Sequence, residues 1–110
     1  MQVYLTESAE RYLSSLQGVP ERPIKINLTG IDWKGPRYEL ALVEPEKFQE
    51  YKDYVIKQED INFLYDDIVA RSARNISIDY QEIAGNKALL VYNKDFKKEE
   101  LKEYQAEIKQ

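Results

Sequence analysis

The stretch GIDWKGPRY, residues 30–38, joins two segments in which apolar residues recur at every second position, residues 24–28 and residues 38–42. This alternation is typical of half-buried β-strands. Two glycines and a proline between the segments favour a turn. The stretch therefore predicts a β-hairpin across a loop from Gly30 to Pro36, with the chain's only tryptophan, Trp33, at its centre.

The composition is that of a folded protein with few options for chemistry. The chain has 110 residues, of which 43% are hydrophobic and 33% charged, enough for the core of a single domain. It contains no cysteine, which excludes disulfides, thiolate catalysis and thiolate-held metals. It also lacks histidine, the commonest proton-transfer group and nitrogen ligand. We therefore expect no enzyme, no catalytic residues, no metal site and no cofactor.

The charge and the hydropathy bear on partners and location. With 16 Lys and Arg against 20 Asp and Glu, the net charge is −4, which disfavours nucleic acid as a partner. The first residues lack the pattern of a signal peptide, and no run approaches the roughly 20 apolar residues of a membrane span. The sequence therefore predicts a cytoplasmic protein that does not enter a membrane.

The N-terminal part predicts a short strand that runs directly into a helix. Residues 2–5 alternate as a strand does, and the hydroxyl of Thr6 suits a helix cap. Glu7 and Glu10 place negative charge near the positive end of the helix dipole. The apolar stripe expected to face the core consists of Ala9, Tyr12, Leu13 and Leu16.

The middle of the chain is less decisive. Residues 44–53 are polar and suit either a helical turn or a surface loop. Two β-prone runs follow, residues 54–56 and 61–65, joined through KQED. Asp66 or Asp67 can then cap a short helix.

The stretch ISIDYQEIAGNKALLVYN, residues 76–93, predicts a second hairpin. Gly85 and Asn86 both tolerate positive φ and suit a two-residue turn. The register that follows sets Ile83 opposite Ala88, Tyr80 opposite Val91 and Ile78 opposite Asn93.

The last residues predict a solvated C-terminal helix over 95–109. Leu101, Tyr104 and Ile108 form a narrow apolar stripe among charged residues. The stripe suits docking either on the same domain, the commoner outcome for a short helix, or on a second chain.

Several of these strings, in their order, resemble the HesB/IscA-like domain of iron-sulfur cluster biogenesis proteins. The strand-to-helix start reads VYLTESAERYL, Gly30, Gly35 and Tyr38 keep the frame of the family's G-G-C-S-G-x-x-Y loop, and INFLYDDIVARSARNISIDY resembles its later signature. The similarity runs from Val3 to Asn93. The chain differs from the family at the residues that bind the cluster. The position of the loop cysteine falls on Trp33, and the family's C-terminal C-x-C pair has no counterpart.

The resemblance implies an α+β fold in a single domain, residues 1–110, with its core in 3–93. The expected fold is β-rich, with about seven short strands in mixed sheets, an N-terminal helix, a short central helix and the C-terminal helix. The family's thiolate chemistry is impossible in this chain, so the resemblance implies a scaffold that has lost its cluster ligands.

Trp33, with the flanking Lys34 and Arg37, is the candidate contact site for a partner or ligand. The indole either folds back over the core, the more common outcome, or is exposed and offers a large contact area. Lys34 and Arg37 could receive an anion or an acidic partner, or remain solvated charges. Tyr38 is expected in the core, and Asp79 is expected to make a structural hydrogen bond, since a carboxylate in an apolar hairpin needs a partner or water.

The acidic pairs Asp66/Asp67 and Glu99/Glu100 suit helix caps and solvated surface better than a metal site, because adjacent residues on a helix diverge by about 100°. The function hypothesis is a non-enzymatic HesB/IscA-like protein, monomer or weak homodimer, that acts through protein–protein contacts. The alternative is a small-ligand or iron-binding module that uses oxygen ligands and the Gly30–Tyr38 loop.

Overall fold

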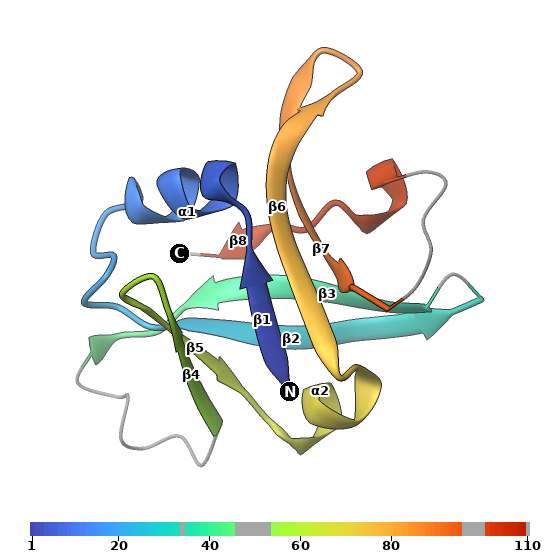
Figure 1. Cartoon of the computed structure of the whole chain (residues 1–110), viewed down its shortest axis with the longest axis horizontal. Helices are drawn as coiled ribbons and strands as arrows, with labels where there is room; N and C mark the ends of the chain where they lie inside the picture. Colours follow the sequence, from blue (N-terminus) through green and yellow to red (C-terminus); the bar gives the residue numbers. More distant parts are fainter. Residues whose placement is uncertain (34, 46–53, 96–100, 110) are drawn as a thin grey trace.

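Two mixed β-sheets that cross each other make up most of the computed structural model, which describes residues 1–33, 35–45, 54–95 and 101–109 (Figure 1). The smaller sheet has the strand order β1-β6-β7 and the larger has the order β4-β5-β2-β3-β8. The strands are β1 (Gln2–Leu5), β2 (Ile24–Asp32), β3 (Gly35–Leu42), β4 (Tyr54–Gln58), β5 (Ile61–Tyr65), β6 (Asn75–Ile83), β7 (Asn86–Asn93) and β8 (Ile108–Lys109). The helices are α1 (Glu7–Ser14), α2 (Asp67–Ser72) and a 3₁₀ turn, η2 (Leu101–Tyr104). The expected α+β, β-rich fold is confirmed.

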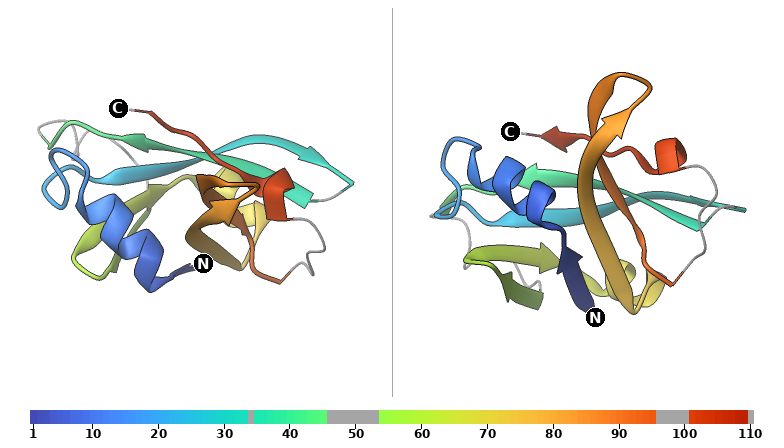
Figure 2. Two further views of the ribbon diagram at one scale, coloured as in Figure 1. Left: turned by 90° about the horizontal axis from the view of Figure 1, so that it is seen from above. Right: turned by 45° about the horizontal axis from the view of Figure 1, so that its top comes forward.

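The hydrophobic core lies where the two sheets face each other (Figure 2). β2 pairs antiparallel with β3 and parallel with β5, and β6 pairs parallel with β1 and antiparallel with β7. The apolar side chains of the alternating segments, residues 24–28 and 38–42, therefore face this core. Its fully buried side chains include Ile24, Ile26, Leu40, Phe63, Ile76 and Ile78.

Both predicted helix caps are confirmed. The Thr6 hydroxyl accepts from the backbone N–H of Ala9 at 3.2 Å, and the Asp66 carboxylate accepts from that of Val69 at 2.9 Å. Each cap satisfies an N–H group that has no partner within its own helix. In α1 the buried residues Ala9 and Leu13 belong to the predicted apolar stripe.

The first hairpin is confirmed, but its connection is shorter than the predicted loop from Gly30 to Pro36. β2 continues to Asp32 and β3 begins at Gly35, and these two residues pair. Trp33 follows β2 directly as a turn residue, and Lys34 lies outside the described residues. Gly35 has a φ of 103°, which side chains disfavour, so its glycine allows the strand to restart directly after the turn.

The predicted register of the β6–β7 hairpin is wrong by two positions. Ala84 and Gly85 form the turn, with φ angles of 51° and 84°. Ile78 consequently lies opposite Val91 instead of Asn93. Both Ile78 and Val91 are buried, and pairing them outweighs the roughly 1–2 kcal/mol that a left-handed alanine costs. A shift of two keeps every side chain on its predicted face.

The predicted C-terminal helix over 95–109 is wrong in its described part. After η2 the chain is extended: the N–H of Ala106 donates to the carbonyl of Leu89 at 2.8 Å, and the N–H of Leu40 donates to the carbonyl of Glu107 at 2.9 Å. Residues 105–109, here called the C-terminal segment, thus join β7 of one sheet to β3 of the other (Figure 2). Open strand edges supply backbone partners that a marginal helix cannot match.

Some predictions fall on residues that the structure does not describe. The helical turn or loop proposed for residues 44–53 lies mostly outside the described residues, as do Glu99 and Glu100. In the described ranges, no helix combines the length and the apolar character needed to cross a lipid bilayer.

Candidate functional site

Trp33 stands at the outer end of the β2–β3 hairpin, with 86% of its surface exposed. Ile31, at the end of β2, is 69% exposed. Of the two outcomes left open for the indole, the structure therefore shows the exposed one, and not the fold-back over the core that is more common. The cause is the strand pairing, which continues up to Asp32 and Gly35 and holds Trp33 beyond the sheet. We call the pair Ile31 and Trp33 the hairpin tip.

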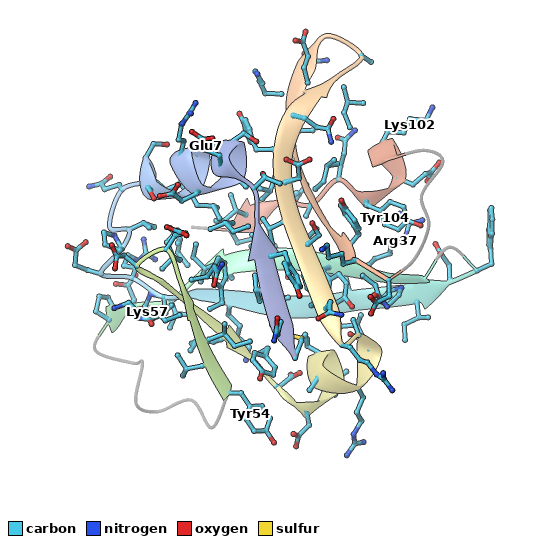
Figure 3. The ribbon with its side chains drawn as sticks, viewed as in Figure 1. Glu7, Arg37, Tyr54, Lys57, Lys102 and Tyr104 are labelled. Carbon is cyan, nitrogen blue, oxygen red and sulfur yellow. The ribbon has the colours of Figure 1, made fainter. Side chains whose placement is uncertain are left out.

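Arg37 ties the base of the hairpin tip to the C-terminal part of the chain. Its Nη2 atom lies 2.9 Å from Oδ2 of Asp32 and 3.8 Å from Oε2 of Glu103. Its guanidinium carbon lies 5.0 Å from the ring centroid of Tyr104, within the range of a cation–π interaction. Figure 3 shows the Arg37 and Tyr104 side chains next to each other. We call these four residues the Arg37 cluster.

The Arg37 cluster is partly covered from solvent. The Arg37 side chain is only 25% exposed, and Tyr104 is buried. The ring of Tyr92 on β7 packs at a tilt against Tyr104, with 5.9 Å between centroids. Partial burial strengthens the attraction between the guanidinium and the two carboxylates relative to an exposed ion pair. The cluster therefore holds the hairpin, β7 and η2 in one arrangement.

Sequence reasoning singled out Arg37 but missed its partners. Asp32 belonged to the predicted loop, so the predicted strands could not bring it to Arg37; the observed pairing, in which β2 continues to Asp32, does. Glu103 and Tyr104 lie more than 60 residues further along the chain and gave no local signal. Lys34, the third predicted site residue, lies outside the described residues.

Tyr38 lies in the core, as predicted. Its hydroxyl lies 2.7 Å from Oγ of Ser72, and that serine donates its single hydroxyl hydrogen to the carbonyl of Val69 at 2.6 Å. Tyr38 must therefore be the donor to Ser72. Burial raises the pKa of Tyr38, and donation of the Ser72 hydroxyl to the phenolate, once the phenol has lost its proton, offsets part of that rise. This arrangement is that of a structural tyrosine.

The remaining acidic candidates have structural partners. Asp66 caps α2, and Asp67 accepts a hydrogen bond from the Tyr54 hydroxyl at 2.8 Å. Asp79 makes the structural hydrogen bonds expected of it, with Thr6 Oγ1 at 2.7 Å and the backbone N–H of Tyr80 at 2.8 Å. Within the described ranges, no three histidine, cysteine or acidic side chains gather in a way that could hold a metal ion.

The comparisons with known proteins reveal similarity at the level of structure. Neither a protein-family model nor a curated protein matches the sequence. The crystal structure of IscA with a [2Fe-2S] cluster superposes with a TM-score of 0.65 and 22% identity, over 98% of this chain and 97% of that one. A candidate Fe-S biosynthesis protein from Lactobacillus salivarius gives a TM-score of 0.71 and 13% identity, over 99% and 97%. Escherichia coli SufA, involved in the biosynthesis of iron-sulfur clusters, gives 0.60 and 16%, over 89% and 85%.

These matches cover nearly the whole length of both chains, so the similarity is one of complete architecture. The chain has the HesB/IscA-like fold, and the resemblance inferred from the sequence is confirmed at that level. The particular feature of this chain is that it carries the fold without a single cysteine.

Proposed function

We propose that this chain is a non-enzymatic protein of HesB/IscA-like fold that acts through protein–protein contacts, with the hairpin tip as its contact site. The observation that carries the proposal is the exposure of Trp33 and Ile31 on a hairpin whose base is fixed. Tryptophan is among the residues most enriched in binding hot spots. A tip that is already ordered loses little conformational entropy on binding.

Arg37 and Lys34 have different parts in this proposal. The Arg37 side chain is directed into the Arg37 cluster, so its contribution is to hold the tip in position. Lys34 follows Trp33 directly in the sequence, and we propose that its charge favours an acidic partner surface.

The residues present do not fit a thiolate-held iron-sulfur cluster. A cluster of that kind needs cysteine sulfur, and the chain has none. Trp33 occupies the position that the family resemblance gives to the loop cysteine. The nearby carboxylates of Asp32 and Glu103 are engaged with Arg37. An iron-sulfur cluster is therefore neither held nor handed on by thiolates of this chain.

The test is a comparison of three tagged proteins in affinity capture from the native host. Trp33→Ala removes the indole, and Ile68→Ala is the matched control, because Ile68 is an exposed apolar residue (61%) on α2. We expect a partner that the wild type and Ile68→Ala retain and Trp33→Ala loses. With purified partner, Trp33→Ala should weaken binding about 30-fold, the effect of a hot-spot residue. Equal retention by all three proteins would reject the hairpin tip.

The alternative is an iron-binding module with oxygen ligands. Incubation with iron and sulfide followed by desalting tests it directly. Protein that is colourless and free of iron agrees with the contact proposal, whereas stoichiometric retained iron would favour the alternative. The cytoplasm remains the proposed location, and cell fractionation would test it.

A further inference from the structure

A surface pocket of about 430 Å³ lies between α1, the β6–β7 hairpin and the C-terminal segment. Figure 1 shows α1 at the upper left and the β6–β7 turn at the top, whereas the outer end of the β2–β3 hairpin lies at the far right. The pocket shares no residue with the hairpin tip or the Arg37 cluster. Its volume lies within the range of about 300–1,000 Å³ that is usual for small-molecule sites. The pocket is lined by Tyr12, Tyr80, Lys87, Ala88, Leu89, Gln105, Ala106, Glu107 and Ile108.

One wall of the pocket is aromatic and part of its lining is apolar. The rings of Tyr12 and Tyr80 stack on each other with 4.1 Å between centroids and 23° between planes. Leu89 is buried, and Ala106 and Ile108 are half-buried and pack against the core. Flat aromatic and aliphatic surfaces of this kind favour a planar ligand, because an added ring stacks or packs edge-on against them.

The polar side chains that line the pocket have no hydrogen-bond or ion-pair partner among the described residues. Elsewhere in the fold, half-buried polar groups such as Asp79 and Arg37 have partners. At the pocket, the half-buried Tyr12 and Tyr80 and the exposed Lys87, Gln105 and Glu107 make no side-chain hydrogen bond or ion pair with any described residue. A few polar groups converging on a pocket that is partly apolar are what fixes the orientation of a small ligand.

We propose that this pocket binds a small aromatic carboxylate that also carries a hydrogen-bond donor. Lys87 is the cation for the carboxylate, and Glu107 is the acceptor for the donor. A doubly charged phosphate is disfavoured, because Lys87 is the single cation among the described residues of the lining, Glu107 lines the same pocket, and the chain carries a net charge of −4. The inference goes beyond the proposed function and does not depend on it.

The test uses 4-aminobenzoate, which combines a planar ring, a carboxylate and an amine. Methyl 4-aminobenzoate lacks the charge, and cyclohexanecarboxylate lacks the planar ring. Each is titrated to millimolar concentration into nitrogen-15-labelled full-length protein. We expect 4-aminobenzoate to shift the amide signals of Ala88, Leu89, Ala106 and Ile108 with saturation, and cyclohexanecarboxylate to bind more weakly.

Lys87→Gln identifies the charged contact without touching the core, since Lys87 is exposed. It should weaken 4-aminobenzoate about threefold, as expected for an exposed ion pair, and leave the methyl ester unchanged. Lys57→Gln makes the same charge change on the exposed face of β4 and should change neither. The proposal is overturned if the four amide signals do not move, if cyclohexanecarboxylate binds equally well, or if both lysine variants behave alike.

Discussion

The hydroxyl of Thr6 donates a hydrogen bond to Oδ1 of Asp79 at 2.7 Å, across 73 residues of sequence. The hydroxyl oxygen of Thr6 also accepts a hydrogen bond from the backbone N–H of Ala9, so Thr6 caps α1 while it ties that helix to β6. The other carboxylate oxygen of Asp79 accepts from Nε2 of Gln81 at 2.9 Å. A single carboxylate thus organises the junction between β1, α1 and β6.

Replacing Asp79 should loosen this junction. Asp79→Ala removes an acceptor used by Thr6, Tyr80 and Gln81, and we expect the free energy of unfolding to fall by about 2 kcal/mol in urea denaturation. Asp79→Asn keeps one acceptor oxygen and should lose about half as much. Glu82→Ala, at an exposed neighbouring position on β6, is the control and should change stability by less than about 0.5 kcal/mol. Equal effects of Asp79→Ala and Glu82→Ala would contradict the structural role of Asp79.

The buried phenol of Tyr38 predicts a pH-dependent contribution to stability. Tyr38→Phe removes its hydrogen bond to Ser72, so near neutral pH it should destabilise by about 1 kcal/mol. Because burial raises the pKa of Tyr38, the unfolded chain releases this proton first, at about pH 10. The stability that depends on the neutral phenol is thus complete below pH 10 and declines as the pH rises toward the pKa of the folded state.

Phenylalanine cannot ionise, so the stability of Tyr38→Phe lacks the decline that ionisation of Tyr38 causes in the wild type above pH 10. The stability gap between wild type and Tyr38→Phe should narrow when urea denaturation is repeated at about pH 11 instead of neutral pH. A titration followed by tyrosinate absorbance should lose its late-ionising component in the variant. A gap that is constant over this pH range would show that Tyr38 titrates alike in both states.

The Arg37 cluster should control the docking of the C-terminal segment. Arg37→Met keeps most of the aliphatic stem but removes the charge shared by Asp32, Glu103 and Tyr104, with an expected loss of about 1–2 kcal/mol. Hydrogen exchange should accelerate at the amides of Leu40 and Ala106, which bond to or from the C-terminal segment.

Arg71→Met serves as the control for that experiment, because Arg71 is exposed near the end of α2. It should leave exchange at both amides unchanged. If amide hydrogen exchange in Arg37→Met also accelerated uniformly throughout β6, the variant would be destabilised globally, and the C-terminal segment would not be released locally.

The turn between β4 and β5 offers a stabilising change. Glu59 and Asp60 have φ angles of 51° and 67°, a left-handed conformation that both side chains disfavour. The pair Glu59→Asn with Asp60→Gly matches this turn and should raise the free energy of unfolding by about 1 kcal/mol. The variant loses the ion pair between Lys57 and Asp60, but this pair is exposed, with 3.9 Å between its charged atoms, and contributes little to the free energy of unfolding. A decrease in stability would mean that the turn is not strained.

The comparison of sequence with structure separates local from distant causes. The caps at Thr6 and Asp66 were predictable, because the capping side chain and the N–H it bonds lie three residues apart. The buried faces of β2 and β3 were predictable, because side chains of a strand alternate with period two wherever its partner lies. The order of these elements also sufficed to suggest the fold.

The register of β6–β7 and the extended C-terminal segment were not predictable in this way. Turn preferences at residues 84–86 differ by amounts smaller than the gain from placing Ile78 opposite Val91. The helical stripe of residues 101–108 is real in the sequence, but the open edges at Leu40 and Leu89 provide hydrogen bonds that an isolated helix cannot outweigh.

The amino-acid sequence by itself determined the elements, the buried faces and the absence of sulfur ligands, because these depend on residue type and on neighbours a few positions away. The exposure of Trp33, the convergence on Arg37 and the pocket beside Tyr12 were decided only by tertiary structure. The exposure of Trp33 follows from the register of β2 with β3, whereas the Arg37 cluster and the pocket require segments that lie far apart in the chain to meet. The free energy of those contacts comes from the packed sheets and not from any one segment.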